Sequence, residues 1–288
     1  MRWIWFNGEL LPTERACLNV LDGAVLHGAA LFETLRCYQG FPFRLEQHLQ
    51  RMRRWLASLR LFQKAQREVD LRTSVIEQAI ASLISANGLQ QQDARLRLTV
   101  TAGSETVSAA CFITAAALSV QQIDRWQQGI SVIVRHDPRA GGGERPKWSS
   151  YAVHLEAQLE AAVSGADEVI WFNAQQRITE GASSNVFAWN GRRLVTPPLQ
   201  EGVLAGITRD VVLNLCAQEG IPCAEAPLSV CELMTAEAVF LTNSVREIVP
   251  VRWLEGRPFG AHPLTTQLQL AYRQLVQTER AQYASPRS

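Results

Sequence analysis

Lysine is nearly absent from this chain of 288 residues. It occurs only at Lys64 and Lys147, and arginine supplies the remaining permanent positive charges. A guanidinium stays protonated in proteins, whereas a lysine amine can lose its proton and attack an electrophile. Lys64 lies in a polar segment rich in glutamine and is expected on the surface. Lys147 is therefore the candidate nucleophile, with an ordinary loop lysine as the alternative.

A strong net charge, a metal-binding motif and a long apolar run are also missing. The net charge of +1 gives no reason to expect nucleic acid or an anionic membrane as a partner. The six cysteines form neither a C-x-x-C pair nor a Cys/His metal spacing, which favours buried thiols in a reducing compartment. No apolar run approaches bilayer length, and the apolar run at the first residues is too short for us to expect a signal peptide there. We expect a soluble, cytoplasmic protein that acts on a small molecule.

The apolar pattern predicts an α+β fold of two domains. In residues 1–120, apolar steps of three and four predict helices at 44–60 and 71–87. Alternating or continuous apolar runs predict strands at 94–101 and 110–116. These elements make a small α+β unit of ordinary domain size.

The second predicted domain, 130–288, is larger and rich in strands, with helices packed outside. Residues 121–129 are polar and without clear periodicity, and are predicted to link the two domains. Ser149 or Ser150 is expected to cap a helix that ends near residue 164. Lys147 then precedes a helix N-terminus, whose dipole disfavours a protonated amine and lowers the pKa of that lysine.

Residues 178–209 hold a second group of candidate site residues. Glu180 precedes a predicted strand at 185–189, a turn and a second strand at 194–196. A helix predicted from Ile207 leaves backbone N–H groups for an anion, with the positive end of the helix dipole behind them. One acid and one phosphate seat on consecutive elements indicate a phosphorylated cofactor, with Lys147 as its nucleophile.

These segments resemble the signature of a known family. The matching residues are Glu180-x-Ala182-x-x-Asn185-Val186-Phe187, Leu194-x-Thr196 and Leu204-x-Gly206-Ile207-x-Arg209. They resemble the class IV (fold type IV) pyridoxal-phosphate aminotransferase family at every position and gap. Further segments follow in family order, namely Phe32-Glu33-Thr34 with Arg36, His48-x-x-Arg51 and Thr242-Asn243-Ser244. The resemblance covers nearly the whole chain and implies a two-domain homodimer that binds pyridoxal 5′-phosphate.

The resemblance also implies a role for each matching residue. The implied cofactor-binding residues are Arg51, Lys147, Tyr151, Glu180, Ile207, Thr208 and Ser244. Lys147 would form the Schiff base, and Glu180 would keep the pyridine nitrogen protonated, which makes the ring an electron sink. Arg51 would bind the phosphate as a charge-assisted partner, together with the residues at the start of the 207 helix and Ser244. Tyr151 would contact the ring hydroxyl.

Within the family, the sequence is most similar to the 4-amino-4-deoxychorismate lyases. Thr34 supplies a hydroxyl that can relay a proton, where branched-chain aminotransferases tend to have glycine. The Arg-Pro pair of those enzymes is missing near Arg97, while His27 and Ala102 differ from many relatives on the expected substrate side. The resemblance implies a lyase that forms 4-aminobenzoate and pyruvate for folate biosynthesis, with Lys147 and Thr34 as catalytic residues. A branched-chain or D-amino-acid aminotransferase is the first alternative, and a non-catalytic binding protein is the second.

Overall fold

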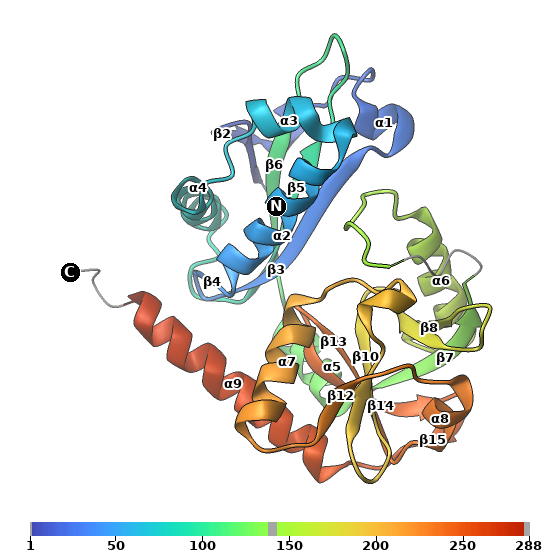
Figure 1. Cartoon of the computed structure of the whole chain (residues 1–288). Helices are drawn as coiled ribbons and strands as arrows, with labels where there is room; N and C mark the ends of the chain where they lie inside the picture. The colour runs from blue at the N-terminus through green and yellow to red at the C-terminus, as the bar shows by residue number, and fades with distance from the viewer. Residues whose placement is uncertain (1, 138–142, 285–288) are drawn as a thin grey trace. The chain divides into compact units, whose positions relative to one another are not determined.

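The computed structural model describes residues 2–137 and 143–284, which divide into two compact units (Figure 1). Unit 1 comprises Met1–Ser119, Pro146–Tyr151 and Glu279–Ser288, and unit 2 comprises Val120–Arg145 and Ala152–Thr278. Both units combine helices with a β-sheet. The prediction of a two-domain α+β fold is confirmed.

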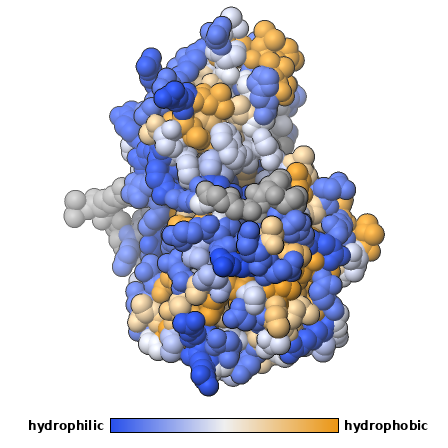
Figure 2. All heavy atoms as spheres, turned by 45° about the vertical axis from the view of Figure 1, so that its right-hand side comes forward, coloured by the Kyte–Doolittle hydropathy of each residue, from blue (hydrophilic) through white to orange (hydrophobic). Residues whose placement is uncertain are grey.

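The surface carries apolar side chains in separate patches among hydrophilic ones, as Figure 2 shows for one face. Two groups of large exposed apolar residues stand out, one around α1 (Gly23–His27) and one on α6 (Ala152–Val163). They are Val20, Leu21, Val25 and Leu26 in the first group, and Val153, Leu155, Leu159 and Val163 in the second. Within residues 2–137 and 143–284, no helix is long and apolar enough to cross a membrane.

Unit 1 is built on a six-stranded antiparallel sheet in the order β2-β1-β6-β5-β3-β4. The strands are β1 (Trp3–Phe6), β2 (Glu9–Pro12), β3 (Ala30–Tyr38), β4 (Phe41–Pro42), β5 (Ala94–Thr101) and β6 (Cys111–Ala117). Besides α1, its helices are α2 (Leu45–Ser58), α3 (Gln63–Glu68) and α4 (Thr73–Ala86), with 3-10 turns at Thr13–Arg15 and Arg60–Phe62. The predicted helices and strands of this region are confirmed to within a few residues at each end.

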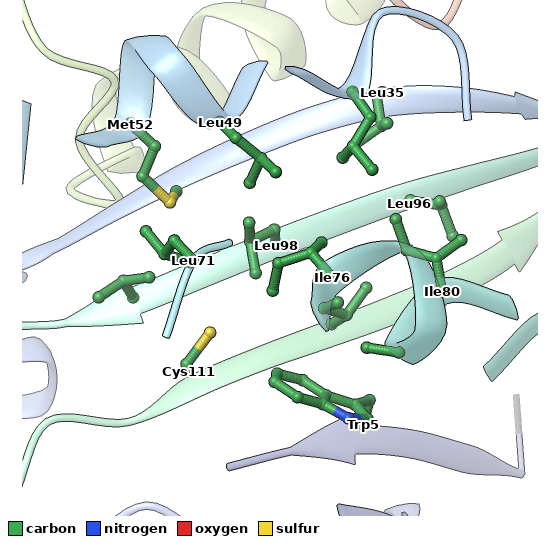
Figure 3. Packing of buried hydrophobic residues seen from close by; sticks show 14 of the residues in the cluster. Trp5, Leu35, Leu49, Met52, Leu71, Ile76, Ile80, Leu96, Leu98 and Cys111 are labelled. Carbon is green, nitrogen blue, oxygen red and sulfur yellow. The ribbon is translucent and has the colours of Figure 1, made fainter. Parts of the chain in front are cut away.

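One face of this sheet forms the core of unit 1. Leu35 of β3 and Leu98 of β5 lie among buried side chains of α2 and α4, including Leu49 and Ile76 (Figure 3). Because side chains alternate along a strand, the residues between them point to the opposite face. Residues 32 and 34 of β3 and residue 97 of β5 therefore lie on the face that the core does not use.

Residues 146–151 join unit 1 by pairing with β3. The Phe32 N–H donates to the Lys147 carbonyl (3.0 Å), and the Ser149 N–H donates to the Ala30 carbonyl (2.8 Å). The hydroxyls of Ser149 and Ser150 donate to the Gly28 carbonyl at 3.2 and 3.0 Å. The prediction that one of these serines caps the following helix is wrong, because the helix begins at Ala152 and Tyr151 therefore occupies the N-cap position.

Unit 2 contains a nine-stranded mixed sheet in the order β12-β11-β10-β13-β14-β7-β8-β9, with β15 paired to β14. The strands are β7 (Ile130–His136), β8 (Glu168–Phe172), β9 (Ile178–Gly181), β10 (Asn185–Trp189), β11 (Leu194–Thr196), β12 (Cys223–Glu225), β13 (Ala238–Asn243), β14 (Glu247–Leu254) and β15 (Arg257–Pro258). Its helices are α5 (Val120–Gln128), α6, α7 (Ile207–Gln218), α8 (Val230–Thr235) and most of α9 (Pro263–Ala284), with a 3-10 turn at Leu199–Glu201.

The central strands of unit 2 also use their two faces differently. Val186 of β10 and Leu241 of β13 belong to the main core of the unit. Phe187 and Phe240 point to the other face, where their rings stack at 5.0 Å. Asn185 and Thr242 are directly paired across the same two strands and so share that second face.

The predicted linker, 121–129, is wrong. Residues 120–128 form α5, which belongs to unit 2. Trp126 packs against the core of that unit, and Arg125 forms an ion pair with Asp167. The physical reason is that Val120, Ile123 and Trp126 recur at three-residue steps and place apolar groups along one side of a helix. The predicted second domain also differs, because Pro146–Tyr151 and Glu279–Ser288 group with unit 1.

Candidate functional site

The non-core face of the unit 1 sheet brings several predicted residues together around Phe32. Thr34 of β3 is paired with Arg97 of β5, so both side chains lie on this face. The Lys147 Nζ lies 4.8 Å from the centre of the Phe32 ring, and the Arg97 guanidinium carbon lies 3.6 Å from it. The Tyr151 ring meets Phe32 edge-on, with centroids 5.7 Å apart. An amine, a hydroxyl, a phenol and a guanidinium therefore share one surface.

Arg97 also lies on this face, and no role was predicted for it from the sequence. No acidic side chain within 2–137 or 143–284 forms an ion pair with it, and its guanidinium stacks on Phe32 instead. The pKa of Arg97 lies below its ordinary value, and burial is the largest cause. Tyr151 partly offsets this effect, and Arg95 adds to it. A guanidinium that is partly withdrawn from water and has no carboxylate beside it is suited to an anionic ligand such as a carboxylate. The sequence feature that could have indicated this role is the position of Arg97 in the alternating strand 94–101, two residues from Arg95 and so on the same face.

Arg51 lies on the core side of the same sheet, in a buried polar cluster. Its Nε donates to Glu33 Oε1 (2.8 Å) and its Nη2 donates to Glu33 Oε2 (2.6 Å). The ring nitrogen Nδ1 of His48 is 2.8 Å from Glu33 Oε2. All three residues are buried, so Arg51 is not a solvated surface charge. Its guanidinium is instead fixed in orientation by a carboxylate that takes two of its donors.

The charges in this cluster follow from burial and pairing together. Burial raises the pKa of Glu33, but the Arg51 guanidinium and His48 outweigh it and bring the pKa to about 2. Burial lowers the pKa of His48, against the opposite effect of Glu33. At neutral pH the cluster therefore holds an ionised Glu33, a charged Arg51 and a neutral imidazole that donates to the carboxylate.

Glu180 is the central acid of unit 2 and lies in β9. It is 5% exposed, and its Oε2 accepts the Leu204 N–H at 2.7 Å. The Asn185 amide is 3.5 Å from the same oxygen, while Oε1 forms an ion pair with Arg145. The carboxylate is therefore oriented from one side, and its other oxygen is within reach of a positively charged N–H donor.

The N-terminus of α7 provides backbone donors near this acid. No side chain within the described part of the chain caps the helix at Gly206. The Asn185 amide donates to the Leu204 carbonyl (3.0 Å), and a Cβ at Gly206 would lie 1.9 Å from Asn185 Oδ1. Glycine is thus required where the Asn185 side chain meets the backbone. The N–H groups of Ile207 and Thr208 follow immediately and can receive an anion.

Ser244, the last predicted phosphate ligand, lies in the turn between β13 and β14. The two residues before it end β13, where Thr242 pairs with Asn185 of β10. Unit 2 therefore carries Glu180, the α7 N-terminus and Ser244 on elements linked by neighbouring strands.

The residues present fit pyridoxal phosphate. An uncapped helix N-terminus suits its phosphate, and a carboxylate that already faces a cation suits its protonated ring nitrogen. The Lys147 amine suits its aldehyde. No group of three His, Cys, Asp or Glu residues in the described segments could hold a metal ion.

Comparison with known proteins identifies the family. Residues 30–254 match the family model described as amino-transferase class IV. The chain is 31% identical to the branched-chain-amino-acid aminotransferase of Escherichia coli K12 over 290 residues, which covers 94% of this chain and 91% of the relative. It is 28% identical to the aminodeoxychorismate lyase of Bacillus subtilis over 285 residues, which covers 95% and 94%.

The solved structures agree with the sequence relatives. The crystal structure of the Escherichia coli branched-chain amino acid aminotransferase superposes with a TM-score of 0.82 at 30% identity, over 95% of this chain and 94% of the other. A hypothetical aminotransferase from Mycobacterium tuberculosis in a PLP-bound form shares the fold with a TM-score of 0.81. The chain therefore belongs to the class IV aminotransferase family and is an enzyme whose cofactor is pyridoxal phosphate.

Proposed function

We propose that the protein is a 4-amino-4-deoxychorismate lyase, which releases pyruvate and forms 4-aminobenzoate. The observation that carries the proposal is the position of Thr34 opposite Arg97, on the sheet face where the Lys147 amine lies over Phe32. This face combines a base, a hydroxyl that can relay a proton, and a guanidinium for a substrate carboxylate. The similarity to the Bacillus subtilis lyase supports the same reading.

The cofactor is held, in this proposal, by the residues that the family resemblance implies. Arg51, the N–H groups of Ile207 and Thr208, and the hydroxyls of Thr208 and Ser244 bind its phosphate. Glu180 binds the ring nitrogen, Tyr151 the ring hydroxyl and Lys147 the aldehyde carbon. When bound, pyridoxal phosphate supplies an electron-withdrawing ring in conjugation with the substrate nitrogen.

The side chains of unit 1 then move the protons. Lys147 Nζ takes the proton from the substrate carbon that carries the nitrogen. Arg97 binds a carboxylate of the substrate and so orients that carbon toward the amine. Thr34 Oγ1, together with Lys147, returns a proton to the departing pyruvate, which leaves as its enol. Because the amino group stays on the aromatic product, no keto acid is needed to complete the cycle.

A second candidate is an aminotransferase that acts on branched-chain or D-amino acids. The specific observation in its favour is that the Escherichia coli branched-chain enzyme is more similar in sequence, at 31% identity, than the Bacillus subtilis lyase at 28%. A D-alanine aminotransferase from Bacillus licheniformis is also a relative, at 27% identity. A purely binding protein is disfavoured by membership of this enzyme family.

We also infer a homodimer in a reducing, cytoplasmic compartment. The apolar side chains exposed around α1 and on α6 support burial against a second copy, because patches of this kind mark interaction surfaces. All six cysteines are free, which is usual in the cytoplasm.

Light scattering should give twice the chain mass of 32.1 kDa, and a mass of a single chain at micromolar concentration would refute the dimer.

The choice between the two activities depends on a keto acid. Purified protein given 4-amino-4-deoxychorismate should form 4-aminobenzoate and pyruvate with no keto acid added, and product should be measured by chromatography. Amino-group exchange between glutamate or D-alanine and a keto acid, with no 4-aminobenzoate formed, would show that the lyase proposal is wrong.

Replacement of the proposed base should abolish turnover. In Lys147→Ala the rate constant kcat should fall at least about 100-fold, the lower end of what a positioned base contributes. Lys64→Ala is the matched control, because Lys64 Nζ donates to the carbonyls of Ser104 and Val107 and has no role in the proposed chemistry. Near-normal turnover in Lys147→Ala, or an equal loss in Lys64→Ala, would remove Lys147 from this role.

Arg97→Gln tests the carboxylate site. A hydrogen bond to a charged group contributes about 1.5–3 kcal/mol, so KM for the substrate should rise about 10- to 100-fold. The affinity for pyridoxal phosphate should stay unchanged, because Arg97 is assigned to the substrate. The exposed Arg67 at the end of α3 gives the control, Arg67→Gln. An unaltered KM in Arg97→Gln would contradict the assignment.

A further inference from the structure

Glu168, the first residue of β8, connects two turns of unit 2 although neither turn is adjacent to it in sequence. Its exposed fraction is only 1%. The first turn, residues 182–184, joins β9 to β10 and follows Glu180. The second turn, residues 243–246, joins β13 to β14 and carries Ser244. Each turn thus belongs to one end of the proposed cofactor site.

The first turn is bound to Glu168 Oε1. This oxygen accepts the Ser183 N–H at 3.0 Å and the Ser184 hydroxyl at 2.6 Å. A Cβ at Gly181 would lie 2.6 Å from the same oxygen and 2.2 Å from Ser184 Oγ. Glycine directly after Glu180 therefore lets the buried carboxylate approach the backbone beside the central acid.

The second turn is bound to the other oxygen through Arg246. The Arg246 Nη2 donates to Glu168 Oε2 and also to Ser183 Oγ, the latter at 2.9 Å. The guanidinium is itself largely buried, with 14% of its side chain exposed. One ion pair therefore spans the space between the two turns.

Asn243 makes a second connection and shapes the turn around Ser244. Its amide donates to the Ser183 carbonyl at 3.2 Å. Its Oδ1 accepts the N–H groups of Val245 and Arg246 at 3.0 and 2.8 Å. The turn that presents Ser244 is therefore fastened to the first turn on both sides.

The backbone at the end of this turn needs such support. Glu247 has φ +64° although it is not glycine, and its exposed fraction is 8%. Side chains with a Cβ rarely adopt this left-handed conformation, and it persists where surrounding contacts determine it. The ion pair of the preceding residue, Arg246, is one of those contacts.

We propose that Glu168 and Arg246 are positioning residues that hold Ser244 in place for the cofactor phosphate. The inference rests on the proposed role of Ser244 as a phosphate ligand, and it does not depend on whether the enzyme is a lyase or an aminotransferase. A buried carboxylate needs its donors, and loss of the Arg246 donor leaves Glu168 uncompensated between the two turns. The 243–246 turn should then shift, and Ser244 should lose its contact.

The test compares two ligands that differ only in the phosphate. The dissociation constants of pyridoxal phosphate and of pyridoxal are measured by absorbance titration for the full-length protein and for Arg246→Gln. Pyridoxal phosphate should bind about 10-fold more weakly to the variant, as expected for one lost hydrogen bond to a charged group, while pyridoxal binding should change by less than about 2-fold. A role confined to stability would weaken both ligands equally.

Two further variants test whether Arg246 acts through Ser244. Ser244→Ala should show the same selective loss, and Ser244→Ala/Arg246→Gln should be no weaker than Arg246→Gln alone, because both changes act on one contact. Arg125→Gln is the matched control, since it removes an ion pair with Asp167, next to Glu168, without touching either turn. This control should bind both ligands normally.

The role of Ser244 as a phosphate ligand and the role of Arg246 in positioning it can fail separately. A selective loss in Ser244→Ala with none in Arg246→Gln overturns the positioning role alone. No selective loss in Ser244→Ala overturns the phosphate assignment and the positioning role together. If Arg246→Gln binds neither ligand because an unpaired carboxylate prevents folding, Glu168→Gln/Arg246→Gln is measured instead. That variant removes both charges and should show the same selective loss, and equal loss for both ligands overturns the proposal.

Discussion

Main-chain pairing between residues 147–149 and β3 is the constraint on which the chemistry of unit 1 depends. Two backbone hydrogen bonds, Phe32 N–H to Lys147 carbonyl and Ser149 N–H to Ala30 carbonyl, fasten a segment more than 110 residues downstream beside the strand. Because the main chain is held, the Lys147 amine can move only through its own side-chain torsions. In this structure the amine lies over Phe32, on the sheet face that also presents Thr34 and Arg97.

Both units separate stability from chemistry by using the two faces of a sheet. In unit 1 the core and the Arg51 cluster lie on one face of β3, and Lys147, Thr34 and Arg97 lie on the other. Unit 2 repeats this division, with its main core on one side of β10 and Asn185 on the other. At two places in unit 2 a polar side chain approaches the backbone where glycine leaves room, Asn185 at Gly206 and Glu168 at Gly181. These close approaches link the acid in β9 to the helix N-terminus and to the β13–β14 turn.

The sequence predicts the regular elements better than it predicts how they meet. The helix at 44–60 was predictable because its apolar residues recur at three- and four-residue steps, and the strand at 94–101 because its residues alternate. The helix at 120–128 was mistaken for a linker because three apolar residues are set among glutamines. The attachment of residues 146–151 to β3 could not be predicted, since it is made by backbone groups that carry no sequence signal. The lack of an ion pair at Arg97 among the described residues could not be predicted either, since it depends on which side chains other strands place beside it.

The central claim is that Lys147, held beside β3, is the amine that reacts with the cofactor aldehyde. The most direct measurement is to load the protein with pyridoxal phosphate, reduce it with borohydride, digest it and locate the added mass by mass spectrometry. With only two lysines in the chain, the result is unambiguous. We predict the cofactor mass on the peptide that contains Lys147 and none on the peptide that contains Lys64. Labelling of Lys64, or of neither lysine, would contradict the account.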